Sequence, residues 1–442
     1  MTVRIGLIGA GGMGRAHAER IENELAGGRI VAVADLNLEG AKAVAEPLGA
    51  KAYGSGAELI ADPDVDAVLI ATFSKVHAPD VIAAVEAGKY VLCEKPLATT
   101  PEDCIAIMEA EQKAGKKLVT VGFMRRFDAG YQEMRAALEG GELGCATLVH
   151  CRHRNPSVPE GYTTRNMIDD TATHEIDICR YLLEDEIVSV RVDAPRSTSH
   201  RFDHLQDPLV LVARTASGVL IDDEINVNIQ FGYSIECKLV MEAGTIRLSD
   251  QNTVITRDSY GNRNPICRSH IDRFHAAFNQ EVQQWIRAVE RDEHTRSTAW
   301  DGYAATCVVD AGLASLENGG RQVDVEMIDK PAFYAWQASR RRPSRCARIG
   351  SGARDCCVFA GAPALCLADD DGAHSPRSSG GARSCLPGRR LFVGRTASPR
   401  GAVEGPETAS LNHFPRCYCH YIMGCRHGRR APRGDLLGRH RP

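Results

Sequence analysis

The stretch Val3–Gly14, VRIGLIGAGGMG, joins a short β-rich run to a glycine turn and opens a helical pattern that continues to about Leu25. It has the G-x-G-x-x-G spacing in the strand–turn–helix context that gives this pattern its meaning. In such a turn Gly9 permits the tight bend, Gly11 lets a pyrophosphate approach the backbone, and Gly14 lets the helix pack closely on the strand. The stretch therefore predicts a dinucleotide-binding fold, with the helix N-terminus facing the anion.

An acidic residue follows at the spacing of a ribose-binding carboxylate. The run Ile30–Ala34 is typical of a second strand and ends in Asp35, 21 residues after Gly14. A carboxylate at this position binds the hydroxyls of the adenosine ribose. No Arg follows at 36–38 to accept a 2′-phosphate, so the sequence favours NAD over NADP.

Strands and helices then continue to alternate. Apolar runs typical of strands lie at 65–71, 90–93 and 118–121, and helical patterns lie at 38–48, 76–87 and 101–114. This alternation predicts an α/β fold with a Rossmann-type, doubly wound parallel sheet, whose ligands bind beyond the carboxyl ends of the strands. The residues that follow these ends, and so line the expected crevice, are Thr72, Glu94, Lys95 and 122–126. Lys95, just before Pro96, can reach both cofactor and substrate, although a surface lysine in a turn is the alternative.

From about Cys145 the pattern becomes rich in short strands. They are expected at 147–152, 187–192, 208–214, 219–228, 234–242 and 244–249, with long helices at 274–291 and 303–318. This pattern predicts a C-terminal α+β domain with a large, open, mostly antiparallel sheet. We place the nucleotide-binding domain at 1–123 and the substrate-binding and oligomerisation domain at 124–337.

One helical stretch of this second domain contains side chains of the types that take part in catalysis. In Asp169–Leu183, DDTATHEIDICRYLL, an uninterrupted helix puts Asp170, His174 and Asp177 on one face at i, i+4 and i+7. The opposite, apolar face consists of Ala172, Ile176, Cys179 and Leu183. A carboxylate beside an imidazole orients it and stabilises its charged form, so the polar face can transfer protons. The alternative is a solvated face with a helix salt bridge.

The last hundred residues differ from the rest. Between Ser339 and Pro442 there are 19 Arg, no Lys and 7 acidic residues, a net charge of +12, whereas the remainder carries −16. This composition lacks hydrophobic periodicity and does not describe a folding domain, so we interpret 338–442 as a disordered, out-of-frame tail. The alternatives are a basic nucleic-acid-binding arm and a metal site at Cys417, Cys419 and Cys425.

The N-terminus and the apolar runs bear on location. The N-terminal apolar run leads straight into the glycine turn without a cleavage-site pattern, and no apolar run is as long as a membrane span. We therefore expect a cytoplasmic protein with no membrane partner.

Seven stretches carry a family resemblance from about residue 3 to Tyr334: GLIGAGGMGRAHAERI, CEKPLATT, VGFMRRFDAGY, HRNP, DDTATHEIDICRYL, FGYSIEC and TAWDGYAA. In this order they resemble the Gfo/Idh/MocA oxidoreductase family. The GxGxxG and EKP motifs are shared by the whole family. The GFMRRFD, HRNP and D-x-x-x-HEID stretches are similar to those of its inositol-oxidising members.

The resemblance implies an activity and a set of site residues. The implied reaction is the NAD-dependent oxidation of one ring hydroxyl of myo-inositol to 2-keto-myo-inositol (scyllo-inosose). The implied catalytic residues are Lys95, Asp170 and His174. The implied polyol contacts are these three together with Arg125, Asn155, Asp177 and Tyr233. The expected cofactor contacts are Gly9, Gly11, Gly12, Met13, Gly14, Asp35, Thr72, His77, Glu94, Lys95 and Arg125.

The implied roles are chemical ones. His174 is the expected general base, with Asp170 orienting it, and Lys95 stabilises charge on the reacting oxygen and fixes the cofactor ribose. The resemblance also implies a homotetramer associated through the open face of the second sheet. No metal and no nucleic-acid partner are expected.

Two rival functions stay open. The first is a dehydrogenase for scyllo-inositol, another cyclic polyol or a sugar, because pocket shape decides which hydroxyl faces the nicotinamide. The second is a non-catalytic regulator that senses a sugar or NAD with the same fold. The complete set of Lys95, Asp170 and His174 favours an enzyme.

Overall fold

Six parallel strands form the N-terminal sheet of the computed structural model, which describes residues 2–249 and 255–335. Their order, β3-β2-β1-β4-β5-β6, is that of a doubly wound dinucleotide-binding sheet, as predicted. The strands are β1 (Val3–Ile8), β2 (Gly28–Ala34), β3 (Lys51–Tyr53), β4 (Ala67–Ile70), β5 (Tyr90–Glu94) and β6 (Val119–Gly122). The strands β1, β4 and β5 are almost wholly buried, as expected for a sheet covered on both faces.

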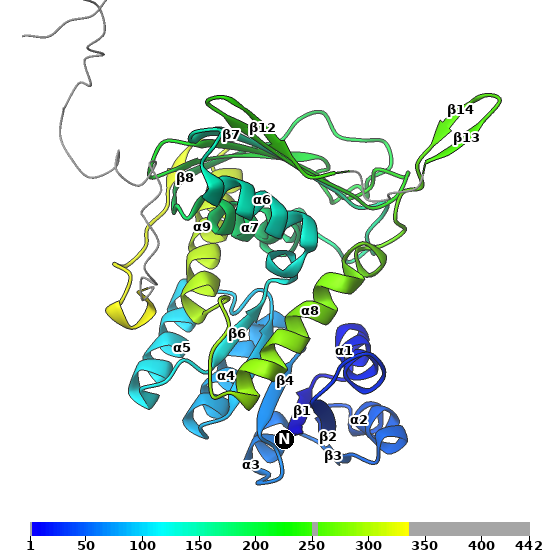
Figure 1. Cartoon of the computed structure of the whole chain (residues 1–442), viewed down its shortest axis with the longest axis vertical. Coiled ribbons are helices and arrows are strands. Elements are labelled where there is room, and N and C mark those ends of the chain that lie inside the picture. The colour runs from blue at the N-terminus through cyan, green and yellow to red at the C-terminus, as the bar shows by residue number, and fades with distance from the viewer. Residues whose placement is uncertain (1, 250–254, 336–442) are drawn as a thin grey trace, which may run out of the picture. The chain divides into compact units, whose positions relative to one another are not determined.

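Helices cover this sheet and flank its strands in Figure 1. They are α1 (Gly12–Asn23), α2 (Leu38–Ala45), α3 (Gly56–Ala61), α4 (His77–Glu86) and α5 (Pro101–Ala114). Local sequence signals fix their ends. For α5, the Thr100 hydroxyl accepts a hydrogen bond from the Asp103 amide, Pro101 occupies the first turn, and Gly115 ends the helix in the left-handed conformation. The strand β3 and the helix α3 were not among the predicted elements.

A seven-stranded sheet forms the second part of the chain, in the order β12-β11-β7-β10-β9-β8-β15. The strands are β7 (Ala146–Arg154), β8 (Ile187–Asp193), β9 (Leu209–Thr215), β10 (Leu220–Asn226), β11 (Ser234–Met241), β12 (Gly244–Arg247) and β15 (Val323–Asp324). All neighbouring pairs are antiparallel except β7 and β10, which are parallel. The predicted mostly antiparallel sheet is confirmed.

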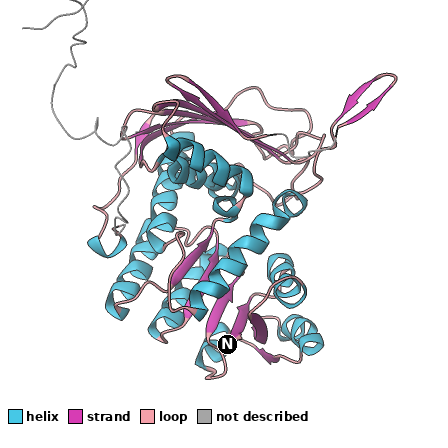
Figure 2. Cartoon of the chain, viewed as in Figure 1, coloured by secondary structure: helices cyan, strands magenta, loops and turns pink. Residues whose placement is uncertain are grey.

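Helices cover one face of this sheet, as Figure 2 shows. They are α6 (Ala129–Gly140), α7 (Thr173–Leu183) and α9 (Ala299–Glu317). In the described residues no helix covers the opposite face. A hairpin of β13 (Thr256–Asp258) and β14 (Gly261–Arg263) extends away from the sheet (Figure 1). Neither α6 nor this hairpin was predicted.

The long helix α8 (His270–Glu290) joins the two parts. Its Trp285 and Ile286 are buried, and Ile286 lies against Gly28 at the start of β2. Its Gln283 side chain exchanges hydrogen bonds with the backbone of Ala26, at 2.9 and 2.8 Å. A helix far along the chain therefore completes the packing of the N-terminal sheet.

The prediction of an uninterrupted helix from Asp169 is wrong. The structure has a π-helical segment at Met167–Ala172 before α7 begins at Thr173. A π turn holds more residues than an α turn, so it shifts the angular positions of the residues on either side of it. Asp170 lies inside this segment and therefore does not share one regular face with Asp177.

No helix within residues 2–249 and 255–335 is long and apolar enough to cross a membrane. The predictions for the tail, 338–442, and for its cysteines lie outside the described residues.

Candidate functional site

A cavity of about 290 Å³ lies where the two parts of the chain meet. The N-terminal part lines it with Met13, Ala71, Thr72, Glu94 and Lys95. The second part lines it with Met124, His153, Asn155, Asp170, Thr171, His174, Tyr233, His270 and Phe278. The carboxyl ends of β4 and β5 open into it, which is where ligands bind in doubly wound folds. The structure therefore brings Lys95, Asp170, His174, Asn155 and Tyr233 together.

Lys95 is held by Asp170. The ammonium nitrogen lies 2.5 Å from Oδ1 of Asp170 and 3.0 Å from its carbonyl oxygen. The other carboxylate oxygen accepts a hydrogen bond of 3.1 Å from the Tyr162 hydroxyl. Burial favours the neutral acid, but the Lys95 charge outweighs it and holds the pKa of Asp170 below its usual value. The result is a fixed ion pair whose ammonium reaches the cavity.

His174 projects from the first turn of α7 into the same cavity. Burial, together with the positive charges of Lys95 and Arg125, lowers the pKa of His174 well below its usual value. At neutral pH the imidazole is therefore uncharged and able to accept a proton. The prediction that Asp170 contacts and orients His174 is wrong, because the Asp170 carboxylate binds Lys95 and Tyr162 instead. We call Lys95, Asp170 and His174 the pocket triad.

The glycine turn beside the cavity suits a dinucleotide. Gly9 has φ +105°, and a side chain there would meet the Ala71 carbonyl. A Cβ on Gly14 would lie 1.9 Å from the Gly9 oxygen, so close packing requires glycine there. Gly11 and Gly12 have nothing within 4 Å of an added Cβ, so a phosphate can approach the backbone at the start of α1.

The other expected cofactor residues line or support this crevice. The carboxylate of Asp35, at the end of β2, accepts hydrogen bonds of 2.8 Å from the amides of Ala10 and Asn37. The ring nitrogens of the buried His77 lie 2.9 and 3.1 Å from the carbonyl oxygens of Pro96 and Thr72. The Thr72 hydroxyl lines the cavity and is buried without a hydrogen-bond partner. Such an orphaned polar group is the kind of feature that a bound ligand satisfies.

Arg125 lies behind the cavity rather than in its lining. Its guanidinium is buried, forms an ion pair with Glu175 and lies 3.2 Å from Nδ1 of His153. Glu175 also lies 2.9 Å from the same His153 nitrogen, and Nε2 of His153 lies 3.4 Å from the Tyr233 hydroxyl. Arg125 therefore supports the two cavity residues His153 and Tyr233.

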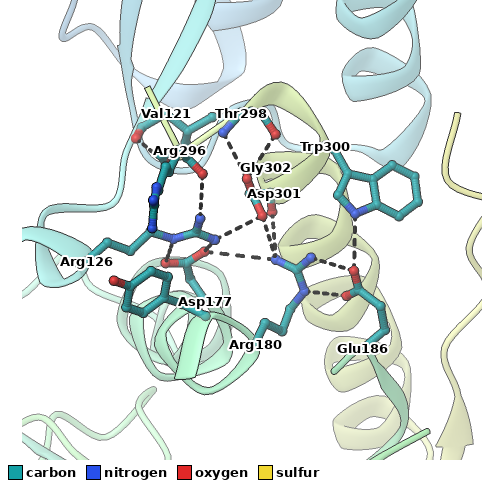
Figure 3. A network of polar contacts seen from close by, with 12 residues as sticks. Val121, Arg126, Asp177, Arg180, Glu186, Arg296, Thr298, Trp300, Asp301 and Gly302 are labelled. Carbon is teal, nitrogen blue, oxygen red and sulfur yellow. Dashed lines mark hydrogen bonds and ion pairs between the residues drawn. The ribbon is translucent and has the colours of Figure 1, made fainter. Parts of the chain in front are cut away.

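Asp177 also lies outside the cavity lining, in a network of buried charges shown in Figure 3. Its carboxylate accepts hydrogen bonds of 2.9 and 2.5 Å from Nε and Nη2 of Arg126. Arg126 also pairs with Asp301 at 3.1 Å, and Arg180 pairs with Glu186 at 2.6 Å. We call Arg126, Asp177, Arg180, Glu186 and Asp301 the buried network.

A larger cavity of about 510 Å³ lies beside this network, near the C-terminal end of α8. None of the predicted catalytic, cofactor or polyol contacts lines it, although Arg126, from the segment 122–126 that was predicted to line the crevice, does. Its one deeply buried charged residue is Arg126, whose Nε, Nη1 and Nη2 are already bound by Asp177, Asp301 and the Arg296 carbonyl. The smaller cavity, with its orphaned hydroxyl and its free imidazole, is the better candidate site.

Sequence reasoning missed several cavity residues, including His153, His270 and Thr171. A signal existed for His153: it precedes Asn155 by two residues at the end of a strand, and alternate residues of a strand share a face. His270 begins α8, far along the chain, and no spacing connects it to the other residues.

Comparisons with known proteins agree with this geometry. Residues 3–123 match the family model described as the oxidoreductase family, NAD-binding Rossmann fold, of Gfo/Idh/MocA. Residues 131–247 match the model of the Gfo/Idh/MocA C-terminal domain. The two models cover the sheet with the glycine turn and, together, most of the residues that line the smaller cavity.

The chain is also similar to individual proteins. It is 47% identical over 334 residues to inositol 2-dehydrogenase 3 of Saccharopolyspora erythraea, covering 76% of this chain and 98% of that protein. It is 43% identical to inositol 2-dehydrogenase of Pseudomonas syringae, covering 76% of this chain and all of the relative. The structure of myo-inositol dehydrogenase from Lactobacillus casei, in complex with NAD(H) and myo-inositol, superimposes with a TM-score of 0.74 at 36% identity and covers 76% of this chain and 100% of that one. The chain therefore belongs to the Gfo/Idh/MocA family of NAD-binding oxidoreductases.

Proposed function

We propose that this protein is an NAD-dependent inositol dehydrogenase that oxidises myo-inositol to 2-keto-myo-inositol. The observation that carries the proposal is the polar cavity, where the pocket triad lies at the carboxyl ends of the nucleotide-binding strands. The relatives and the neighbouring structure named above are inositol dehydrogenases, which supports the choice of substrate.

The residues suggest how the reaction proceeds. Oxidising a carbinol removes a hydride from carbon and a proton from its hydroxyl. His174, neutral because its pKa is lowered, accepts the hydroxyl proton. The Lys95 ammonium stabilises negative charge as it develops on the same oxygen, and Asp170 holds that ammonium in place. Bound NAD supplies the hydride acceptor.

Other polar residues suit a polyol. Asn155, His153 and Tyr233 line the cavity and offer hydrogen-bonding groups to hydroxyls that do not react. We propose direct contacts for Asn155 and Tyr233, and an indirect role for Arg125 through His153. For Asp177 we propose a structural role, because Arg126 binds its carboxylate.

A panel of substrates tests the function. NADH formation should be measured with NAD and myo-inositol, scyllo-inositol, D-chiro-inositol or glucose. We expect myo-inositol to give the highest kcat/KM. A relative from Halalkalibacterium halodurans, 43% identical, is named inositol 2-dehydrogenase/D-chiro-inositol 3-dehydrogenase, so D-chiro-inositol is the second candidate. Binding of NADH without turnover of any of the four would contradict the proposal and favour a sensor.

We also propose a homotetramer that associates through the uncovered face of the seven-stranded sheet. Half-buried side chains on β7, β10 and β11 form a row of ion pairs on that face, including Arg152–Asp222 at 2.8 Å and Arg154–Glu224 at 2.7 Å. Half-exposed Val210 and Val212 lie on β9 beside it. Light scattering after gel filtration should give a tetramer. Val212→Arg should dissociate it, whereas Val76→Arg, on an exposed part of the N-terminal domain, should not.

We propose a cytoplasmic location as well. Seven of the described cysteines are free thiols and Cys145 is disulfide-bonded, and this predominance of free thiols suits a reducing compartment. Fractionation of the source cells tests this placement.

A further inference from the structure

A buried chain of hydrogen bonds ends at Glu94 on the wall of the cavity. Nε2 of His17, on α1, lies 2.7 Å from Oε1 of Glu94. Nδ1 of the same ring lies 2.9 Å from Nη1 of Arg20. Nε of Arg20 donates a hydrogen bond of 2.8 Å to the side-chain oxygen of Asn279 on α8. Both His17 and Arg20 are almost fully buried.

The chemistry of the chain fixes the protonation of His17. A guanidinium has only donors, so Nδ1 of His17 must accept from Arg20. A doubly protonated ring would place two N–H groups face to face at 2.9 Å. The ring is therefore neutral with its proton on Nε2, and that N–H donates to the Glu94 carboxylate. The links from Arg20 to His17 and from His17 to Glu94 both point toward Glu94, whereas Arg20 donates to Asn279 in the other direction. The second oxygen of Glu94, Oε2, has a long contact of 3.3 Å from the Lys95 amide.

We propose that His17 and Arg20 are positioning residues that hold Glu94 ionised and fixed in direction, so that it accepts hydrogen bonds from a ribose hydroxyl of the bound cofactor. The inference rests on the proposed function only through NAD, not through the polyol. Neither residue touches the cavity: they are absent from its lining, and they act through Glu94.

The surroundings of Glu94 explain why it needs this chain. Burial favours its neutral form, but the interactions with His17, of which the hydrogen bond is the largest, and then those with Lys95 outweigh burial and lower the pKa of Glu94. The titratable groups that interact with this carboxylate are His17, Arg20, Cys93, Lys95, His270 and Glu281. Burial and the nearby Glu94 charge raise the pKa of Glu281, so Glu281 is neutral at neutral pH and does not oppose the ionised Glu94.

Two matched variants separate the effect of the His17 hydrogen bond from the effect of the size of the side chain. In His17→Gln the amide nitrogen takes the place of Nε2 and can still donate to Glu94. In His17→Asn the amide is shorter, lies near the position of Nδ1, and cannot reach Glu94. NADH affinity, followed by the fluorescence of the bound dinucleotide between about pH 5.5 and 8.5, reports on both without requiring turnover.

The expected result is a pH-dependent loss of affinity in one variant only. His17→Asn should bind NADH about tenfold more weakly near neutral pH, because a buried carboxylate has lost its donor. Its affinity should fall further as the pH decreases, because the pKa of Glu94 rises and the carboxylate takes up a proton. The wild type and His17→Gln should be nearly independent of pH and within about twofold of each other. A pH-independent His17→Asn, or a His17→Gln as weak as His17→Asn, would overturn the proposal.

A measurement on the wild-type protein covers the case in which His17→Asn does not fold. The imidazole nitrogen resonances of His17, assigned by their loss in His17→Gln, should show a protonated Nε2 and an unprotonated Nδ1 between about pH 6 and 8. A protonated Nδ1 would contradict the direction of the chain. Failure of the polyol assay would leave both tests unaffected, so the two proposals fail separately.

Discussion

The helix α7 contributes residues to both the pocket triad and the buried network, but their side chains have different surroundings. His174 and Asp177 are one turn apart at the start of α7, and both were expected to meet the substrate. Around Asp177 every guanidinium of the network finds a carboxylate, as Figure 3 shows. His174 faces the cavity, and among residues 2–249 and 255–335 no hydrogen-bond partner contacts its ring.

This difference distinguishes charged or polar side chains that can act on a ligand from those that only stabilise the fold. A buried ion pair with its hydrogen bonds complete connects elements and has nothing left to offer a ligand. A polar side chain that lines a cavity and has an unused hydrogen-bond donor or acceptor can bind a ligand. The two regions should therefore respond to mutation in different measurements: the triad in turnover and the network in stability.

The largest effect is expected from His174→Ala. His174 is the proton acceptor that we propose, so its removal should lower kcat by about 10²- to 10⁴-fold. NADH affinity and melting temperature should change little, because the ring contacts the His153 ring but forms no hydrogen bond with a described residue. His200→Ala, at an exposed position, is the control and should retain full activity. Unchanged turnover in His174→Ala would remove this residue from the role of base.

The complementary change is Asp177→Asn. It replaces the carboxylate that binds Nε and Nη2 of the buried Arg126, which keeps Asp301 as its counter-charge, so the free energy of unfolding should fall by about 1–3 kcal/mol. Urea unfolding measures this, with the exposed Asp193→Asn as the control, for which a change within about 0.5 kcal/mol is expected. The KM for the polyol should stay near that of the wild type. A raised KM at unchanged stability would return Asp177 to the substrate site and end the contrast between the two regions.

The charge of Lys95 influences how the activity of the pocket triad depends on pH. Burial and the Lys95 charge lower the pKa of His174, so the wild-type base stays neutral and kcat/KM should not decline until the solution is distinctly acidic. Lys95→Gln removes a positive neighbour and raises the pKa of His174. Because the base works only when neutral, the loss of activity on acidification should move to higher pH, by about one unit. The residual kcat/KM of the variant across pH measures this, and an unmoved acid limb would contradict it.

A smaller effect is expected at the edge of the triad. The Tyr162 hydroxyl contacts Asp170 at 3.1 Å, the hydroxyl of Thr171 at 2.6 Å and the carbonyl oxygen of Asn166 at 2.8 Å. Tyr162→Phe removes these contacts but keeps the ring, so kcat/KM should fall about three- to tenfold. Tyr53→Phe, which removes a hydroxyl bound to Asp62 far from the cavity, is the matched control. Equal activity of both variants would show that the Lys95–Asp170 pair holds its position unaided.

The smallest effect is expected from removing residues 337–442. The cavity, both sheets and the buried network all precede this segment, and the Pseudomonas syringae relative is matched in full by 76% of this chain. Activity and melting temperature should therefore be those of the full chain. A loss of either would assign the segment a role in the fold or in assembly.

Much of this architecture could be predicted from local signals. The glycine turn, the acidic end of β2 and the strand ends before Thr72 and Lys95 depend on neighbours close in sequence. The π-helical segment could not be predicted from periodicity, and it moves Asp170 off the regular face that it was predicted to share with Asp177. The parallel pairing of β7 with β10 and the position of His270 depend on contacts between distant segments, which spacing does not reveal.

The packing of α8 has a consequence for synthesis on the ribosome. The N-terminal sheet is complete in sequence by residue 122, yet the Ile286 side chain that covers Gly28 belongs to a helix about 160 residues further on. At synthesis rates of roughly 5–20 residues per second, that helix emerges roughly 10–30 s later. Throughout this interval the nascent sheet has an uncovered apolar surface, so translation speed and chaperone supply should influence yield even when the finished enzyme is stable.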